Sequence, residues 1–244
     1  MNLIDGYEVI ARGKISVLSV SDSPLENRIL ENQARIEKIW QDALKENRKL
    51  FNDKLLSFLG FKDDGGNIRV NGSFVEYKDF LAQKSGLGLG IKPIGVSGVV
   101  VVREQDEEYV LFARRSKNVT LYSGFLELVP SGGIDGKYIR PNGEVDYKAQ
   151  LLTEFCEETG LPESCVKEIS ELCLMLDSKD NVYDVCCRID AEAQREVFME
   201  GFRSKEYESP VFVKMRELRA FIEKNRDLMV PTSVGIVEEL FRTG

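Results

Sequence analysis

The sequence contains no histidine among its 244 residues. This absence excludes Ser-His-Asp triads, histidine-ligated zinc and general acid–base catalysis by an imidazole ring. An active site in this chain therefore has to be built from carboxylates, Lys, Arg, Tyr, Ser or Cys, or from a metal ion held by oxygen.

Cysteine is scarce and is confined to the second half of the chain. The five cysteines form no CxxC pattern, and two of them are adjacent, at Cys186 and Cys187. An odd number of cysteines without metal-ligand spacing is typical of reduced thiols that pack as small hydrophobic side chains. This usage favours a cytoplasmic protein.

Long apolar runs are also missing. No uninterrupted stretch of 18 apolar residues occurs, and "MNLIDGYEVIARGK" at the start has no apolar core behind a basic segment. The sequence thus predicts neither a membrane span nor an export signal, and we expect a soluble cytoplasmic protein. The net charge of −8 argues against general affinity for nucleic acid or anionic membrane. An anionic substrate would then need local basic groups or metal ions.

The first 90 residues predict a small α/β unit. "YEVIARGKISVLSV" alternates enough for one or two strands, and "SPLENRILENQARIEKIWQDALKENRKLF" places apolar side chains on one face of a long amphipathic helix. Two apolar runs around "DDGGN" predict a hairpin, and "YKDFLAQKSG" predicts a short helix that ends near Gly86. The glycine-rich segment 86–93 is interpreted as a linker.

Residues 91–244 alternate strands and helices, which favours an α/β layered fold. "IGVSGVVVVREQDEEYVLFARRS" predicts a strand, a polar turn and a second strand that ends at Arg114 and Arg115. A long loop over "SGGIDGKYIRPNG" precedes a helix over residues 147–159, with Asp146 as its N-cap and Gly160 as its C-terminal stop. Further strands and helices follow.

Three glutamates on that helix are the strongest candidates for chemistry. Glu154, Glu157 and Glu158 are spaced i, i+3 and i+4, so they project from one face. Three like charges on one turn repel each other unless water or a cation screens them. Mg²⁺ suits such a cluster, because it binds few carboxylates and completes its shell with water and phosphate oxygens. A solvated helix face is the alternative interpretation of the helix taken alone.

The residues around the helix resemble the Nudix box. "PSGG" lies upstream, Gly143-Glu144 follows, and "EFCEETGL" matches the last part of that motif. "IEKIWQDALKENRKLF", "FVEYKDFLAQ", "GVSGVVVV" and "RRSKNV" extend the resemblance to the animal and plant Nudix proteins that hydrolyse UDP-glucose and UDP-galactose. Thr153 stands where the box has Arg, and the spacing from Glu144 to Thr153 is one residue longer than usual.

The resemblance implies a Nudix-type α/β/α sandwich with a mixed sheet, preceded by the N-terminal α/β unit, with domains at 1–90 and 91–244. It implies hydrolysis of a nucleotide sugar to nucleoside monophosphate and sugar 1-phosphate. Mg²⁺ or Mn²⁺ would be held by Glu154, Glu157, Glu158 and Glu144, with the three helix glutamates as the catalytic groups. The residues expected to bind the substrate are Arg114, Arg115, Ser131, Gly132 and Gly133.

Two other functions remain open at this point. One is hydrolysis of ADP-ribose or another nucleoside diphosphate derivative, because no residue identifies the base. The other is a nucleotide-binding Nudix module with impaired catalysis, motivated by Thr153. Tyr122, Phe125 and Tyr138 are candidates for contacting a base, with loop packing as the alternative, and Glu208 is a candidate extra acidic residue.

Overall fold

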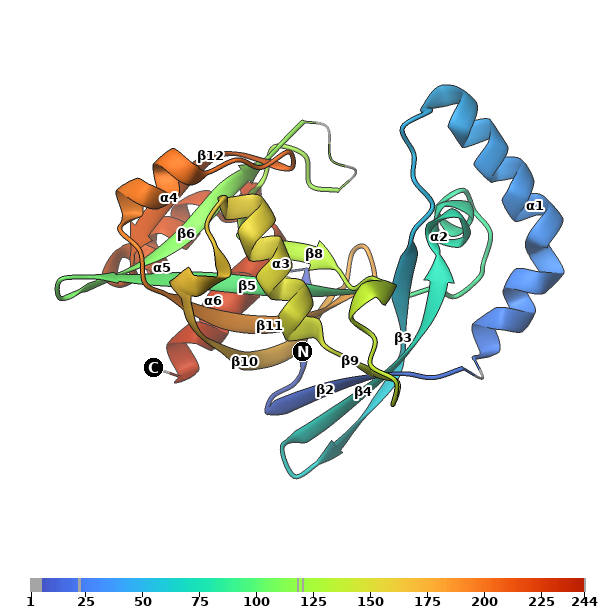
Figure 1. The fold of residues 1–244 in the computed structure, drawn as a ribbon, viewed down its shortest axis with the longest axis horizontal. Coiled ribbons are helices and arrows are strands. Elements are labelled where there is room, and N and C mark those ends of the chain that lie inside the picture. Colours follow the sequence, from blue (N-terminus) through green and yellow to red (C-terminus); the bar gives the residue numbers. More distant parts are fainter. Residues whose placement is uncertain (1–5, 22, 118, 120, 244) are drawn as a thin grey trace.

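The computed structural model describes residues 6–21, 23–117, 119 and 121–243, so Asn118 in "RRSKNV" lies outside the described residues. Within this part of the chain, two mixed β-sheets stand side by side (Figure 1). The larger has eight strands. Six follow the order β1 (Tyr7–Ala11), β10 (Val166–Asp177), β11 (Val182–Ala191), β5 (Ile94–Glu104), β6 (Glu107–Arg115) and β12 (Tyr207–Lys214). Two short strands join this sheet: β7 (Leu126–Leu128) pairs with β6, and β8 (Ser131–Gly133) pairs with β5.

Helices cover both faces of the larger sheet. On one face, Leu151 and Phe155 of α3 (Tyr147–Thr159) join a core that includes Val96 of β5. On the other face, α5 (Leu218–Asn225) and α6 (Pro231–Thr243) pack against a core that includes Val99 and Val101. Figure 1 shows α3 in front of the sheet and α6 behind it. β5 and β11 run parallel while their other neighbours are antiparallel, so the sheet is mixed. Because helices pack on both of its faces, the predicted α/β/α sandwich with a mixed sheet is confirmed.

The smaller sheet has the order β3 (Lys54–Asp64), β4 (Asn67–Glu76), β2 (Lys14–Ser19) and β9 (Glu144–Val145). The predicted hairpin forms between β3 and β4, with Gly65 and Gly66 at positive φ in its turn. The predicted helices are α1 (Pro24–Glu46) and α2 (Tyr77–Lys84), which share a separate apolar core that includes Leu25, Ile36 and Ala82. Segment 86–93 has no helix or strand in the structure, and its Leu87, Leu89 and Ile91 are buried in the same apolar core.

The two sheets exchange one strand each. β1, from the N-terminal part, pairs with β10 in the larger sheet, and β9, from the second half, pairs with β2 in the smaller sheet. The division of the chain after residue 90 therefore stays a prediction. The exchange brings the segment before α3 into contact with the N-terminal unit.

Some elements differ from expectation. The predicted loop over residues 131–143 contains β8 and the short helix η1 (Gly136–Tyr138), and α4 (Arg195–Gly201) lies in a region where no helix was expected. Three further short helices are η2 (Glu163–Cys165), η3 (Met215–Glu217) and η4 (Arg226–Leu228). β8 forms because β5 supplies its hydrogen-bond partners, a long-range contact that local sequence does not encode. No helix in the described part of the chain is long and apolar enough to cross a membrane.

The ends of α3 follow from its capping residues. The Asp146 carboxylate accepts a hydrogen bond from the Ala149 N–H at 3.1 Å, and Gly160 adopts φ +75° at the C-terminus. A Cβ at Gly160 would lie 2.0 Å from the Gly201 carbonyl oxygen, so glycine is required there for two reasons. The helix runs over residues 147–159, as its sequence predicts.

Candidate active site

Glu154 and Glu158 of α3 both lie against β8. The Ser131 N–H donates a hydrogen bond to Glu158 Oε2 at 3.2 Å. A Cβ at Gly132 would lie 2.4 Å from the Glu154 carboxyl carbon, so the missing side chain of Gly132 makes room for that carboxylate. Glu157, between them in sequence, is exposed. The helix thus directs two of the three predicted glutamates onto the backbone of predicted substrate-binding residues.

Burial and mutual repulsion disfavour ionisation of these two carboxyls. Burial raises the pKa of Glu154 to about 7, and the charge of Glu157 adds to the effect. Burial raises the pKa of Glu158 well above its usual range, and the charges of Glu154 and Glu127 act in the same direction. A bound cation would offset the effects of burial and of the neighbouring charges on both pKa values, because it favours the ionised form of a carboxyl.

The residues present fit a hard divalent cation at an open site. The donors are carboxylate oxygens, and Mg²⁺ is commonly bound by one or two carboxylates, with water and substrate phosphates completing the shell. Among the described residues, no three His, Cys, Asp or Glu side chains stand together as a group able to hold a metal ion. Glu154 and Glu158 supply two carboxylates, the number that a Mg²⁺ site completed by substrate phosphates commonly uses.

Gln150 orients Glu154 from one turn earlier in the helix. Its Nε2 donates to Glu154 Oε1 at 2.7 Å, while its buried Oε1 has no hydrogen-bond partner within the described structure. Thr153, at the position of the box arginine, instead shares a 2.5 Å hydrogen bond with the Tyr138 hydroxyl and donates to the Ala149 carbonyl. The positioning contact to Glu154 comes from the glutamine and not from residue 153.

The structure does not group Glu144 with the other predicted metal ligands. Glu144 belongs to β9 at the edge of the smaller sheet, and its carboxylate accepts a hydrogen bond from Arg140 at 3.1 Å. Arg140 also contacts Asp146, the N-cap of α3. In this arrangement the Glu144 carboxylate supports the segment that leads into the helix. Its role as a metal ligand stays a prediction.

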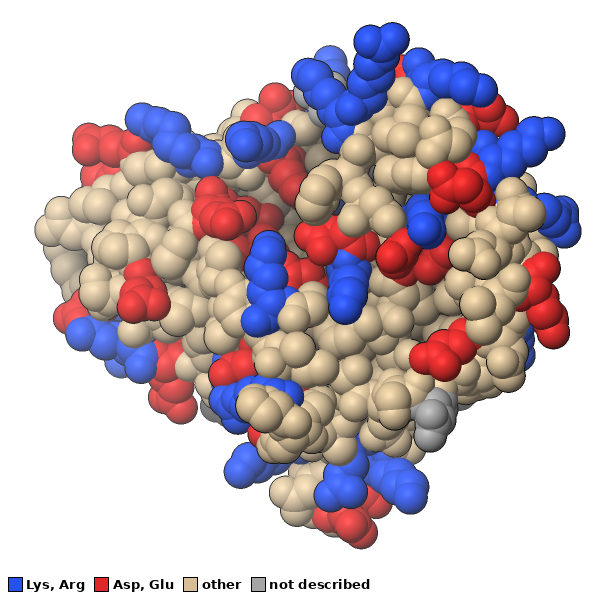
Figure 2. Space-filling view, turned by 45° about the vertical axis from the view of Figure 1, so that its right-hand side comes forward, with Lys and Arg blue, Asp and Glu red and all other residues tan. Residues whose placement is uncertain are grey.

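A cavity of about 230 Å³ lies beside the helix glutamates. Four of the five residues predicted to bind substrate line it, namely Arg115, Ser131, Gly132 and Gly133. Acidic side chains come to the same cavity from separate strands and loops: Glu127, Asp177, Asp184 and Glu206. Figure 2 shows acidic and basic side chains gathered around the hollow in the middle of this face of the molecule.

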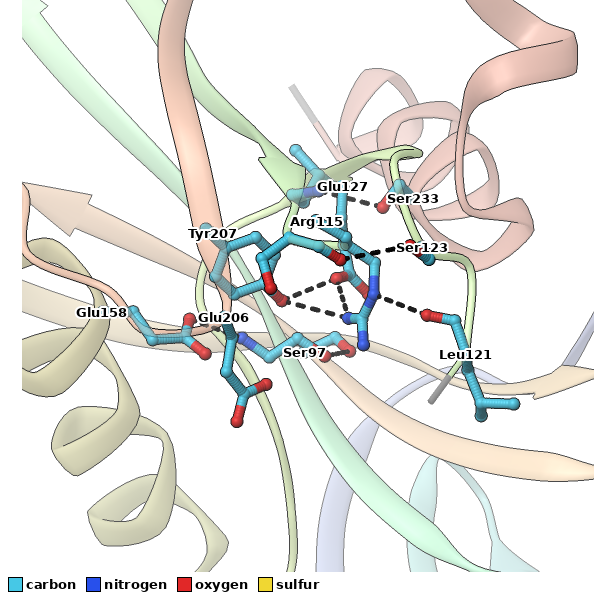
Figure 3. A network of polar contacts seen from close by, with 12 residues as sticks. Ser97, Arg115, Leu121, Ser123, Glu127, Glu158, Glu206, Tyr207 and Ser233 are labelled. Atoms are coloured by element: carbon cyan, nitrogen blue, oxygen red, sulfur yellow. Dashed lines mark hydrogen bonds and ion pairs between the residues drawn. The ribbon is translucent and has the colours of Figure 1, made fainter. Parts of the chain in front are cut away.

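Arg115 is held in a buried network with Glu127 and Tyr207 (Figure 3). Its guanidinium forms an ion pair with Glu127, and its Nε donates to the Leu121 carbonyl at 3.0 Å. The Tyr207 hydroxyl donates to the same carboxylate of Glu127 at 2.6 Å. Arg114 instead donates to the Gly124 carbonyl at 2.6 Å.

A chain of hydrogen bonds links the helix to Asp184 on β11. Ser131, whose N–H contacts Glu158, has its hydroxyl 3.1 Å from that of Ser97, and Ser97 donates to Asp184 Oδ1 at 3.2 Å. Burial raises the pKa of Asp184 to about 7, and the charge of Glu127 contributes. A Cβ at Gly95 would lie 2.5 Å from the same Oδ1, so Gly95 leaves space for this carboxylate.

Sequence reasoning missed several residues of this site. Glu127 in "FLELVP" and Asp184 in "VYDVCC" are single carboxylates within apolar strands, a pattern that already indicates a buried acid with a special partner. Gln150 precedes Glu154 by four residues, which places both on one helix face. The candidate Glu208 is exposed, and the residue that lines the cavity is Glu206.

A larger groove of about 480 Å³ lies elsewhere, between α1 and β4. Its described lining combines apolar residues of α1, such as Ile29 and Leu30, with Lys54, Lys78 and Asp79. The predicted site residues gather at the smaller cavity instead. We therefore place the candidate active site at the smaller cavity, because a larger volume without these residues does not indicate a reaction.

No protein-family model and no curated protein matches this sequence. Solved structures with a similar fold include the Nudix domain of Shewanella oneidensis NrtR complexed with ADP ribose, at 15% identity over 62% of this chain and 86% of that chain, with a TM-score of 0.44. A mutT/nudix family protein from Listeria innocua has 11% identity, covers 62% and 92%, and scores 0.44. A C. elegans Ap4A hydrolase has 11% identity, covers 62% and 96%, and scores 0.42. Likeness at this level does not identify a substrate, so function is inferred from this chain's own residues.

Proposed function

We propose that this protein is a metal-dependent pyrophosphohydrolase of the Nudix type. Its substrate is a nucleotide sugar of the UDP-glucose or UDP-galactose class, and its products are a nucleoside monophosphate and a sugar 1-phosphate. The observation that carries the proposal is the placement of Glu154 and Glu158, within the motif "EFCEETGL", against the backbone of Ser131 and Gly132.

The two carboxylates would hold Mg²⁺ or Mn²⁺, with the exposed Glu157 beside them. Bound there, the ion would neutralise the diphosphate, orient it and lower the pKa of a bound water. The chain's own groups supply the rest. Gln150 fixes the Glu154 carboxylate, and the Ser131 N–H fixes Glu158.

The reaction needs a base to remove a proton from the attacking water. Because the chain has no histidine, a carboxylate is the natural base, and Glu157 or Glu158 takes this role in our proposal. The water oxygen forms a bond to one phosphorus, its proton passes to the carboxylate, and the bond from that phosphorus to the bridging oxygen breaks. The departing phosphate keeps the bond's electron pair.

A binding module without catalysis is the competing function. The raised pKa values of the helix carboxylates argue against this function. Holding Glu154 and Glu158 together, partly desolvated, opposes their ionisation, as their raised pKa values indicate. Such a cost is expected where charge is needed for chemistry or for a metal ion. Hydrolysis of ADP-ribose by the same machinery is the second alternative, since the diphosphate chemistry is identical.

A substrate panel tests the proposal. UDP-glucose, UDP-galactose, ADP-ribose, ADP-glucose and nucleoside triphosphates are incubated with Mg²⁺ or Mn²⁺, and the products are identified. We expect turnover of the UDP-sugars to UMP and sugar 1-phosphate. Preferred turnover of ADP-ribose would support the alternative substrate, and tight binding without any turnover would support the binding module.

Two variants test the assignment of the site. Glu157→Gln and Glu158→Gln should each lower kcat at least ~100-fold, as expected for the loss of a catalytic base or metal ligand. Glu163→Gln, at an exposed glutamate just beyond the helix, is the matched control and should keep the wild-type rate. Wild-type rates in both helix variants would refute the site.

A further inference from the structure

Acidic side chains outnumber basic ones in the lining of the cavity beside α3. Glu127, Asp177 and Asp184 line it, and so does the exposed Glu206. Among the described lining residues Arg115 supplies the only guanidinium, which is already paired with Glu127. A diphosphate inside such a cavity would be repelled by the surrounding carboxylates. The lining therefore suits a neutral part of a substrate.

The size of the cavity restricts which part enters. Its volume of about 230 Å³ is below the roughly 300–1,000 Å³ that is typical for a whole drug-sized ligand, so one component of a nucleotide sugar fits and the complete molecule does not. The neutral components are the hexose, the ribose and the base, and the hexose carries more free hydroxyl groups than the ribose. Ionised carboxylates only accept hydrogen bonds, and a sugar offers several O–H donors. Uracil presents mainly carbonyl acceptors, which would face the carboxylates unfavourably.

The position of the cavity places it next to the reacting diphosphate. Ser131 and Gly132 contact Glu158 and Glu154 on one side and line the cavity on the other. Asp184 is reached from Ser131 through Ser97, by contacts of 3.1 and 3.2 Å. Tyr122 forms another part of the wall, and its hydroxyl donates to Asp177 at 2.6 Å. A group joined to a phosphate at α3 would extend into this space.

We infer that this cavity is a binding site for the sugar of a nucleotide sugar, and that Asp184 recognises it by accepting hydrogen bonds from its hydroxyl groups. The inference rests on the proposed function for the kind of ligand. The diphosphate then lies at the mouth of the cavity beside Glu154 and Glu158, and the nucleoside lies outside it. Asp184 is a specificity-determining residue in this arrangement.

Calorimetry without divalent metal tests the inference separately from hydrolysis. UDP-glucose is compared with the methyl ester of UDP, which has the same diphosphate diester but a methyl group in place of the sugar. The wild-type protein should bind UDP-glucose more tightly. Asp184→Asn should weaken UDP-glucose binding about 10- to 100-fold, the scale for losing a hydrogen bond to a charged group, and leave the methyl ester unchanged.

Asp190→Asn is the matched control, because Asp190 lies on the same strand but pairs with Arg188 away from the cavity. It should bind both ligands as the wild type does. Equal affinity of the wild type for the two ligands overturns the inference, without any need for a folded variant. An equal change for both ligands in Asp184→Asn also overturns it. Hydrolysis of UDP-glucose with Mg²⁺ in the same preparation reports on the proposed function independently.

Discussion

Replacing Gly132 with alanine tests whether the position of Glu154 controls catalysis. The new methyl group would lie 2.4 Å from the Glu154 carboxyl carbon and Oε1, whereas ordinary contact begins at 3.4 Å. The carboxylate therefore has to move by about 1 Å, and a misplacement of this size can lower a rate about 100-fold. We expect kcat with UDP-glucose to fall by about this factor and the Mg²⁺ concentration needed for half-maximal rate to rise.

Stability should hardly change in the same variant. The contact is with the end of a flexible side chain, and Gly132 does not adopt a positive φ. Gly88→Ala provides the control, because Gly88 does not line the cavity and a Cβ there meets no atom within 4 Å. Steady-state kinetics and thermal unfolding of both variants separate the two effects. A wild-type kcat in Gly132→Ala, or an equal loss of kcat in Gly88→Ala, would falsify the assigned role of Glu154.

Three further predictions concern the surrounding contacts. Gln150→Leu removes the donor to Glu154, so kcat should fall about 10- to 100-fold. It also removes a buried acceptor that has no partner in the described structure, so the Tm should hold or rise. A lower Tm with an unchanged kcat would contradict this prediction. Arg115→Met leaves Glu127 buried without its cation, so the free energy of unfolding measured by urea denaturation should fall by about 3–5 kcal/mol. Adding Glu127→Gln should restore part of this loss. A loss below about 1 kcal/mol would count against a stabilising role of the ion pair. Because the pKa of Asp184 is raised to about 7, ionising this carboxyl destabilises the folded wild-type protein between about pH 4 and pH 7. Asn does not ionise, so the difference in Tm between Asp184→Asn and the wild type should grow in favour of the variant over this range and then level off. A difference in Tm that does not depend on pH would refute the raised pKa.

Several features of the fold were predictable because their causes are local. The capping carboxylate of Asp146 and the left-handed Gly160 define the ends of α3 within a single segment. The hairpin of β3 and β4 depends on a glycine turn, and α1 on its apolar spacing. The three glutamates of α3 were placed on one helix face by the same local reasoning, whereas the structure turns Glu154 and Glu158 toward β8 and leaves Glu157 exposed.

The remainder of the site depends on contacts between distant segments. Glu127 and Asp184 lie 57 positions apart in the chain, and they reach one cavity only through the pairing of β7 with β6, β6 with β5 and β5 with β11. Strand order and register are set by how the whole sheet buries its apolar faces, so no local pattern specifies this meeting. The same holds for β8, which exists through its pairing with β5.

The sequence by itself determined the helix, its carboxylates and their suitability for a hard cation, because spacing along a helix follows from backbone geometry alone. Only the tertiary structure decided how Glu154 is oriented in the absence of an arginine at residue 153. It supplied Gln150 as the donor and Gly132 as the space into which the carboxylate fits. Tertiary packing also surrounded the neighbouring cavity with acids, and this negative lining is the physical reason for placing a sugar there instead of a phosphate.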